Sequence, residues 1–302
     1  MVDEAKKRIL ITGINGMLGQ DLAPVLESQY GIIGIDVQNL GDSNYVFFCC
    51  DITDVKGLKK VFQENNPWLV IHTAAFTDVD GCEKYPEKAE AINVQGTKNI
   101  VGLCRGHKTK LIYISTDYVF NGEKSCAYTE NDATSPLNVY GRTKLLGEEA
   151  VLAGLSDGVI VRTSWLFGKG GKNFVNTIIA KSAEGDALKV VNDQRGSPTY
   201  TVSLAQALKR LINEVFVSSH AGGKYGIYHV SNSKSCTWYE FAKTIIDLCN
   251  INVDVLPVES TQFIRPAKRP GRSILDNSRY EQVTKNRLCT WRQALQSYLS
   301  DL

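Results

Sequence analysis

A short apolar run followed by a glycine-rich turn constrains the fold of this 302-residue chain more than any other feature. Residues 8–13 form a β-rich apolar run, and glycines recur at Gly13, Gly16 and Gly19. An amphipathic segment follows, and a second apolar run ends at Asp36. Strand, glycine turn, helix and strand, in this order within about 30 residues, predict a dinucleotide-binding unit.

The three glycines have distinct uses in such a unit. Gly13 permits the tight turn, Gly16 lets the backbone approach a pyrophosphate, and Gly19 lets helix and strand pack closely. The helix N-terminus offers free N–H groups to the phosphates, and Asp36 can accept hydrogen bonds from both ribose hydroxyls. A purely structural glycine turn is the alternative, but the acid at the strand end favours the dinucleotide. Because a carboxylate repels a 2′-phosphate, Asp36 favours NADH over NADPH.

The chain continues to alternate strands and helices, which predicts an α/β fold with a Rossmann-like doubly wound parallel sheet. Strands are expected at 8–13, 31–36, 45–50, 68–73, 110–115 and 158–162, and helices at 56–65, 86–105 and 137–153. The pattern loosens after residue 162. Further helices are expected at 173–184, 202–217, 235–249 and 288–302, and further strands at 188–191, 225–230 and 253–257. We expect residues 1–165 to form the dinucleotide-binding domain. Residues 166–302 should form mostly a smaller, interleaved C-terminal substrate-binding lobe, with the helix at about 201–218 returning to the first domain.

Charge, hydropathy and cysteine usage argue against several classes of protein. The net charge of +2 gives no argument for a nucleic-acid or membrane partner. No apolar run approaches the roughly 20 residues of a membrane span, and residues 1–7 lack the apolar core of a signal peptide. The eight cysteines form no Cys-x-x-Cys pair and the four histidines are scattered, so we predict neither a metal site nor a disulfide framework. A cytoplasmic location fits this usage.

A tyrosine and a lysine four residues apart, Tyr140 and Lys144, indicate an acid–base pair. A Pro and an Asn just upstream are helix-start signals, so both side chains should lie on one face of a helix. The ammonium favours the phenolate, and we expect it to lower the pKa of Tyr140 toward neutrality. The same spacing also occurs by chance in many helices.

Thr116, at the end of the strand 110–115, could supply a hydroxyl that polarises a carbonyl, with a turn or helix cap as the alternative.

Together these features resemble the extended short-chain dehydrogenase/reductase superfamily, in the glycine loop 12–19, in Thr116 and in the Tyr140–Lys144 pair. More specific blocks resemble the dTDP-4-dehydrorhamnose reductase family across nearly the whole chain, namely residues 115–122, 161–168, 172–175, 196–200, 228–232 and 265–270. The resemblance implies that NAD(P)H reduces the 4-keto group of the sugar nucleotide dTDP-6-deoxy-L-lyxo-4-hexulose, giving dTDP-L-rhamnose.

The resemblance also implies roles for single residues. Tyr140 would protonate the developing alkoxide, Lys144 would hold the nicotinamide ribose, and Thr116 would orient the oxygen. The family's sugar contacts correspond to Thr116, Asp117 and Trp165, with a core position as the alternative for the tryptophan.

Cofactor contacts implied by the resemblance follow the strand ends. Gly16, Met17 and Leu18 would line the pyrophosphate, Asp36 the ribose, Asp51 and Ile52 the adenine, and Ala74, Ala75 and Phe76 the nicotinamide side. A helix cap at Thr53 or Asp54 is the alternative use of that turn. Asn173, Arg195 and Arg269 would contact the nucleotide or diphosphate.

Some family members bind Mg²⁺ at a dimer interface through an acidic C-terminal feature. That feature is not located in this sequence, so Mg²⁺ and a homodimer both stay open.

Three other functions fit the same fold. A sugar-nucleotide dehydratase needs a second acid directly after Asp117, where this chain has Tyr118. A sugar-nucleotide epimerase is not excluded by residues alone, although the specific blocks favour net reduction. A non-catalytic regulatory subunit, resembling the β-subunit of methionine adenosyltransferase, belongs to a different class. The presence of Thr116, Tyr140 and Lys144 argues against it.

Overall fold

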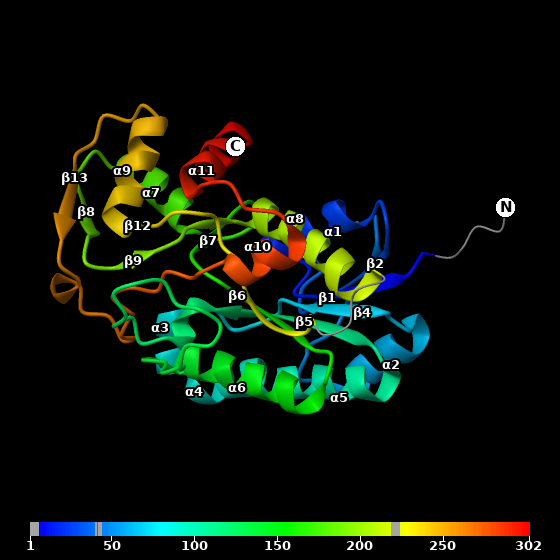
Figure 1. Ribbon diagram of the computed structural model, residues 1–302. Helices are drawn as coiled ribbons and strands as arrows, with labels where there is room; N and C mark the ends of the chain where they lie inside the picture. The colour runs from blue at the N-terminus through cyan, green and yellow to red at the C-terminus, as the bar shows by residue number, and fades with distance from the viewer. Residues whose placement is uncertain (1–5, 40, 42–43, 219–223) are drawn as a thin grey trace.

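The computed structural model describes residues 6–39, 41, 44–218 and 224–302. The centre of this part of the chain is a parallel sheet of seven strands (Figure 1). These are β1 (Arg8–Thr12), β2 (Gly31–Asp36), β3 (Val46–Cys49), β4 (Leu69–His72), β5 (Lys110–Thr116), β6 (Val159–Thr163) and β11 (Gly226–His229). Their order is β11-β6-β5-β4-β1-β2-β3, and every neighbouring pair is parallel. The predicted α/β, Rossmann-like doubly wound fold is confirmed.

β1 lies between β2 and β4, where the strand order reverses. Ile9 of β1 pairs with Ile32 of β2 on one side and with Leu69 of β4 on the other. In open α/β sheets, ligands bind beyond the carboxyl ends of the strands at such a point. β5 is the next strand beyond β4, so Thr116 at its carboxyl end lies at the same edge of the sheet.

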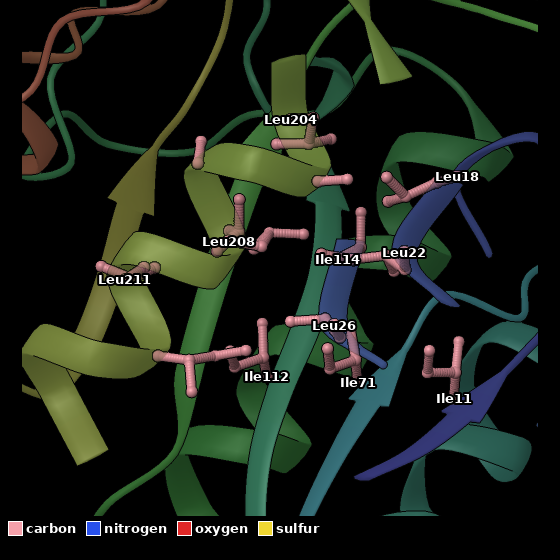
Figure 2. Packing of buried hydrophobic residues seen from close by; sticks show 14 of the residues in the cluster. Ile11, Leu18, Leu22, Leu26, Ile71, Ile112, Ile114, Leu204, Leu208 and Leu211 are labelled. Carbon is pink, nitrogen blue, oxygen red and sulfur yellow. The ribbon is translucent and has the colours of Figure 1, made fainter. Parts of the chain in front are cut away.

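Helices cover both faces of the sheet (Figure 1). One face carries α1 (Met17–Leu26), α8 (Thr201–Ile212) and α10 (Ser278–Thr284), and the other carries α2 (Val55–Asn65), α5 (Thr97–His107) and α6 (Val139–Gly154). Figure 2 shows leucines of α1 and α8 beside isoleucines of the strands: Leu18, Leu22, Leu26, Leu204, Leu208, Leu211, Ile11, Ile71, Ile112 and Ile114. The leucines recur three or four residues apart, which gives each helix one apolar face against the sheet.

The helix expected at 86–105 is divided. The segments are α4 (Pro86–Ala89), a π-helical stretch η1 (Glu90–Gly96), and α5. A π-helical turn often marks a functional position. Here it carries the buried Asn93, whose Oδ1 accepts the N–H of Phe76 (2.8 Å) and whose Nδ2 donates to Thr143 Oγ1 of α6 (3.0 Å). Asn93 therefore joins the loop after β4 to the helix that carries Tyr140.

A smaller lobe lies beyond the carboxyl ends of the strands, at the upper left of Figure 1. Its elements are β7 (Leu166–Phe167), α7 (Phe174–Ser182), β8 (Leu188–Val191), β9 (Arg195–Gly196), β10 (Thr199–Tyr200), β12 (Cys236–Thr237), α9 (Trp238–Leu248), β13 (Val255–Val258) and α11 (Trp291–Ser300). The strands form three two-stranded pairs, β10 with β7, β12 with β9, and β13 with β8. The lobe has its own core, in which Phe167, Phe241 and Tyr298 are fully buried.

Some segments differ from the sequence expectation. The strand expected at 225–230 is β11, which extends the main sheet beside β6 instead of joining the smaller lobe. Its two apolar residues explain this position, because Tyr228 packs with the α8 side of the sheet and Ile227 with the α6 side. The segments that the sequence does not predict are short: α3 (Val79–Lys84), η2 (Asp117–Val119), η4 (Ser260–Gln262), α10 and the two-residue strands β7, β9, β10 and β12. Such lengths carry little hydrophobic periodicity. The π-helical end of α8, η3 (Asn213–Val217), lies inside the helix expected at 202–217. The division at residue 165 stays a prediction.

Among the described residues, the structure contains no helix with the length and apolar character needed to cross a membrane.

Candidate active site

A cavity of about 830 Å³ opens at the carboxyl ends of the central strands. Most residues that the sequence assigns to cofactor, catalysis and sugar line this first cavity: Gly13, Gly16, Met17, Leu18, Asp36, Asp51, Ile52, Ala74, Ala75, Thr116, Asp117, Tyr140, Lys144 and Trp165. Gly19 and Phe76 do not line it. Gly19 is buried in α1, and the Phe76 ring lies under the Lys88 ammonium, 4.9 Å from it. The fold thus brings together residues from position 13 to position 165 of the sequence.

The glycine loop closes tightly at one end of the first cavity. Gly13 has a φ of +69°, and a Cβ there would lie 2.9 Å from the backbone of Ala74. A Cβ at Gly19 would lie 2.4 Å from the carbonyl oxygen of Gly13. Gly16 caps α1 without a side-chain hydrogen bond, and the first turn of α1 carries no acid. The loop therefore leaves the N-terminus of α1 free for an anion, which fits a dinucleotide pyrophosphate.

Two carboxylates lie at neighbouring strand ends. Asp36 at the end of β2 accepts the N–H of Asn15 (3.1 Å) on Oδ2 and that of Val37 (2.8 Å) on Oδ1. Asp51 accepts both the N–H and the hydroxyl of Thr53 at 2.8 Å. Both carboxylates are fixed by these bonds and line the first cavity.

The helix cap that was the alternative use of the 51–54 turn is present in the structure. Asp54 is the N-cap, and its side chain accepts the N–H of Lys56 (3.1 Å). Asp51 is therefore not needed as a cap and is left to line the cavity.

Lys144 is buried beneath the first cavity. Its helix α6 starts at the N-cap Asn138, whose Oδ1 accepts the N–H of Gly141 (2.8 Å). Lys144 Nζ donates to the carbonyl oxygen of Ile114 (2.7 Å) and lies 4.1 Å from the centre of the Tyr113 ring. Burial lowers the pKa of Lys144 to about 7, and the negative charge of Glu148 opposes that fall.

The expectation that Lys144 lowers the pKa of Tyr140 is wrong for this arrangement. Burial raises the pKa of the Tyr140 phenol, a hydrogen bond with Thr116 opposes the rise, and the charge of Asp117 adds to it. The ammonium of Lys144 is instead bonded to the backbone of β5. Tyr140 therefore keeps its proton at neutral pH.

Thr116 and Asp117 meet at the end of β5. Thr116 Oγ1 donates to Asp117 Oδ1 (3.1 Å) and accepts the N–H of Tyr118 (3.2 Å), so it also caps the short helix η2. The other carboxylate oxygen of Asp117 accepts the hydroxyl of Ser273. Burial raises the pKa of Asp117 to about 7, and the hydrogen bonds from Ser273 and Thr116 work against that rise.

Two tryptophans form a stacked pair at the boundary with the smaller lobe. Trp165 and Trp238 have ring centroids 3.4 Å apart and planes 4° from parallel. Trp165 has a φ of +48°, in the left-handed region, and a Cβ at Gly196 would lie 2.5 Å from its ring. The sequence prediction includes Trp165 and misses Trp238. The available signal for Trp238 is its place directly after Thr237, an N-cap residue that starts a helix in the substrate lobe.

A second cavity, of about 870 Å³, lies on the smaller lobe between α7, β8 and residues 260–269. Trp238 lines both cavities. Arg269 lines the second cavity, whereas Asn173 and Arg195 line neither. Asn173 caps α7 by accepting the N–H of Asn176 (3.0 Å), and Arg195 Nη2 forms an ion pair with Glu240 (3.1 Å).

Arg269 is held by an aspartate from the first half of the chain. Asp80 of α3 accepts from Arg269 Nη1 and Nη2 at 3.2 and 3.0 Å, and from the N–H of Ala267 at 3.2 Å. Arg265 also pairs with Asp80, at 3.4 Å. The sequence prediction misses Asp80, because its partners lie about 190 residues further along the chain.

Residues 265–273, which we name the connecting segment, reach the catalytic helix as well. The carbonyl oxygen of Lys268 accepts Asn138 Nδ2 (2.8 Å), and Asn138 is the cap of α6. Ser273 at the other end of the segment donates to Asp117. One segment therefore contacts the second cavity, the start of α6 and the end of β5.

Within the described residues, no group of three or more His, Cys, Asp or Glu side chains is arranged to hold a metal ion.

Comparison with known proteins adds to this geometry. The family model described as the RmlD substrate binding domain matches residues 7–302. The dTDP-4-dehydrorhamnose reductase of Streptomyces griseus is 39% identical over 292 residues, covering 96% of this chain and 92% of that protein. The crystal structure of a dTDP-4-dehydrorhamnose reductase ortholog from Clostridium acetobutylicum is 40% identical with a TM-score of 0.88, covering 97% of this chain and 98% of that one.

A second solved structure carries a cofactor. The dTDP-4-dehydrorhamnose reductase of Bacillus anthracis, in complex with NADP, is 38% identical with a TM-score of 0.89, covering 98% of this chain and all of that one. The resemblance drawn from the sequence motifs is thus confirmed: the chain belongs to the dTDP-4-dehydrorhamnose reductase family, whose model is the RmlD substrate binding domain.

Proposed function

We propose that this protein reduces the 4-keto group of dTDP-6-deoxy-L-lyxo-4-hexulose to give dTDP-L-rhamnose, with a nicotinamide dinucleotide as cofactor. The observation that carries the proposal is a single cavity lined by the glycine loop together with Thr116, Tyr140 and Lys144. Family membership at close to 40% identity over almost the full chain supports the substrate class.

Each of the three residues has a task in this reaction. A bound reduced nicotinamide supplies the hydride. Tyr140 carries the proton that the sugar oxygen needs as it becomes an alkoxide, since burial keeps the phenol protonated. Thr116, hydrogen-bonded to Tyr140, orients that oxygen. Lys144 in its charged form holds the cofactor ribose.

The sugar nucleotide would extend across both cavities. We place the sugar beside Thr116, Asp117 and Trp165 in the first cavity and the nucleoside diphosphate toward the second. Arg269 is the candidate for the diphosphate, because a guanidinium pairs with phosphate oxygens bidentately. Asn173 and Arg195 are weaker candidates, because neither lines a cavity.

Asp36 favours NADH over NADPH by the charge argument given above, while the Bacillus anthracis relative was solved with NADP. Both cofactors therefore belong in the assay. The cytoplasmic location stays a prediction, and a homodimer and bound Mg²⁺ both stay open.

The test is a single-turnover assay with the 4-keto sugar nucleotide and each reduced cofactor, followed by identification of the sugar product. Loss of the reduced-nicotinamide absorbance together with formation of dTDP-L-rhamnose supports the proposal. Folded protein that binds the cofactor but consumes none of it would reject the reductase. Tightly bound oxidised cofactor would indicate an epimerase instead, and co-purification with a synthetase partner without turnover would indicate a regulatory subunit.

A further inference from the structure

A buried ion pair lies directly beneath the catalytic residues and has no part in the mechanism above. Arg162 of β6 donates from Nε to Glu148 Oε1 (2.9 Å) and from Nη2 to Glu148 Oε2 (2.6 Å). The two residues are 2% and 1% exposed. Ser115 also donates to Glu148 Oε1, and Arg162 Nη1 lies 3.5 Å from His229 Nε2. Burying two charges is costly, so their presence here calls for a reason beyond packing.

Glu148 continues the spacing of the catalytic helix. Tyr140, Lys144 and Glu148 follow one another at intervals of four residues in α6, which places them on one face. That face packs against β5, where Lys144 bonds to Ile114 and Glu148 bonds to Ser115. The hydroxyl of Ser115 thus ties α6 to the strand one residue before Thr116.

Glu148 also supplies the negative charge that faces Lys144. The other titratable groups around Lys144 are Tyr140 on α6, Tyr113 and Asp117 on β5 and its end, His72 on β4, and Arg162 on β6. Burial lowers the pKa of His72 to about 3 and raises those of the two tyrosines, so these three groups are neutral. Arg162 is charged and paired with Glu148, and Asp117, with a pKa of about 7, titrates in the same range as Lys144. Burial pushes Lys144 toward its neutral form, and the Glu148 carboxylate is the charge that opposes this.

We propose that Glu148 is a positioning residue for the reaction. Its carboxylate, anchored by Arg162, keeps the Lys144 ammonium charged and, through Ser115, holds the strand end that carries Thr116 against α6. This inference rests on the proposed function, in which the charged Lys144 holds the cofactor ribose.

The test measures affinity for NADH and NADPH by fluorescence titration from pH 6 to pH 9, with thermal stability measured on the same samples. In the native protein we expect affinity to fall as the pH rises through about 7, as Lys144 loses its proton. Glu148→Gln should move the midpoint down by about one pH unit, because the ammonium loses its neighbouring anion. Glu148→Asp keeps the negative charge, so its midpoint should lie between those of the native protein and Glu148→Gln. This variant also tests the proposal if Glu148→Gln folds poorly.

Two further variants separate positioning from stability. Asp157→Asn breaks the Lys110–Asp157 ion pair at the opposite end of β5 and should lower thermal stability while leaving the midpoint in place. Ser115→Ala should lower turnover without moving the midpoint. Glu148 variants with lowered stability but the native midpoint would overturn the proposal and leave Glu148 a purely structural residue. Native protein that binds neither cofactor would instead reject the proposed function.

Discussion

Trp238 stacks on Trp165 face to face, and its ring lies where the two cavities meet. The pair joins α9 of the smaller lobe to the loop that follows β6. An aromatic surface at this place suits the apolar faces of a deoxysugar. It also lies between the cavity proposed for the sugar and the cavity proposed for the nucleotide.

Replacing Trp238 with Phe should raise KM for the sugar nucleotide by roughly three- to tenfold, the size of one aromatic stacking contact. Affinity for the cofactor should not change. Steady-state kinetics and cofactor titration check both parts. Trp68→Phe is the matched control, because Trp68 stacks on Tyr30 near the sheet's opposite end and lines neither cavity. Equal changes in KM for the two variants would contradict the assignment.

Tyr140→Phe should lower kcat by about 10²–10⁴-fold, the usual contribution of a general acid, with cofactor binding nearly intact. Lys144→Ala should weaken both cofactor binding and turnover, because a ribose that is no longer held leaves the nicotinamide poorly positioned for hydride transfer. Tyr85→Phe, at a residue with 60% exposure, provides the control. Full turnover by Tyr140→Phe would mean that another group donates the proton.

Asp117→Asn should change how stability depends on pH. In the folded protein the pKa of Asp117 is raised from 3.8 to about 7, so its neutral form favours folding. That contribution is complete below pH 3.8 and is lost as the pH rises through about 7. Asp117→Asn has no carboxyl group to ionise and therefore does not lose this contribution. Its stability relative to the native protein should increase between pH 4 and pH 8. Urea unfolding at several pH values measures this.

Asp132→Asn is the control for that experiment. The hydrogen bond from Lys124 lowers the pKa of Asp132 to about 2, so this group titrates below the measured range. Because the unfolded value of 3.8 also lies below pH 5, the effect of Asp132→Asn on stability should be nearly constant from pH 5 to pH 8. A constant effect for Asp117→Asn over the same range would refute the raised pKa.

Asp36→Ala should shift cofactor preference toward NADPH by roughly tenfold or more, since it removes both the ribose acceptor and a repelling charge. Affinities for both cofactors give the ratio directly. Asp51→Ala, at the proposed adenine contact, should weaken both cofactors alike. An unchanged ratio in Asp36→Ala would show that other residues decide the preference.

Asp80→Asn should raise KM for the sugar nucleotide by roughly tenfold, because the guanidinium of Arg269 loses its charged hydrogen bonds and its fixed orientation. Cofactor affinity should stay the same. Glu240→Gln breaks a comparable pair with Arg195, which lines neither cavity, and should leave KM close to the native value. A native KM in Asp80→Asn would remove Arg269 from the substrate site.

The main sheet and the cofactor side of the site are predictable because their signals are local. Buried parallel strands appear as apolar runs, and the loop at Gly13 needs glycine for reasons visible in the chain itself. The two-residue strands of the smaller lobe have no period to detect.

Asp80 and Ser273 depend on contacts between distant parts of the chain and carry no local pattern of their own. Trp238 is marked in the sequence only by the helix cap before it, and its stacking on Trp165 depends on the fold. The sign of the pKa shift at Tyr140 depends on burial, which spacing alone does not report.

The connecting segment at 265–273 has a consequence for which parts of the sugar nucleotide efficient turnover requires. The segment whose residues 265–269 wall the second cavity also holds Asp117, through Ser273, and the cap of the helix that carries Tyr140, through Lys268. Binding energy from the nucleoside end can therefore be used to fix the geometry around the reacting carbonyl. A free keto-deoxysugar, stripped of its nucleotide, would leave that energy unused and should be turned over slowly even at saturating concentration.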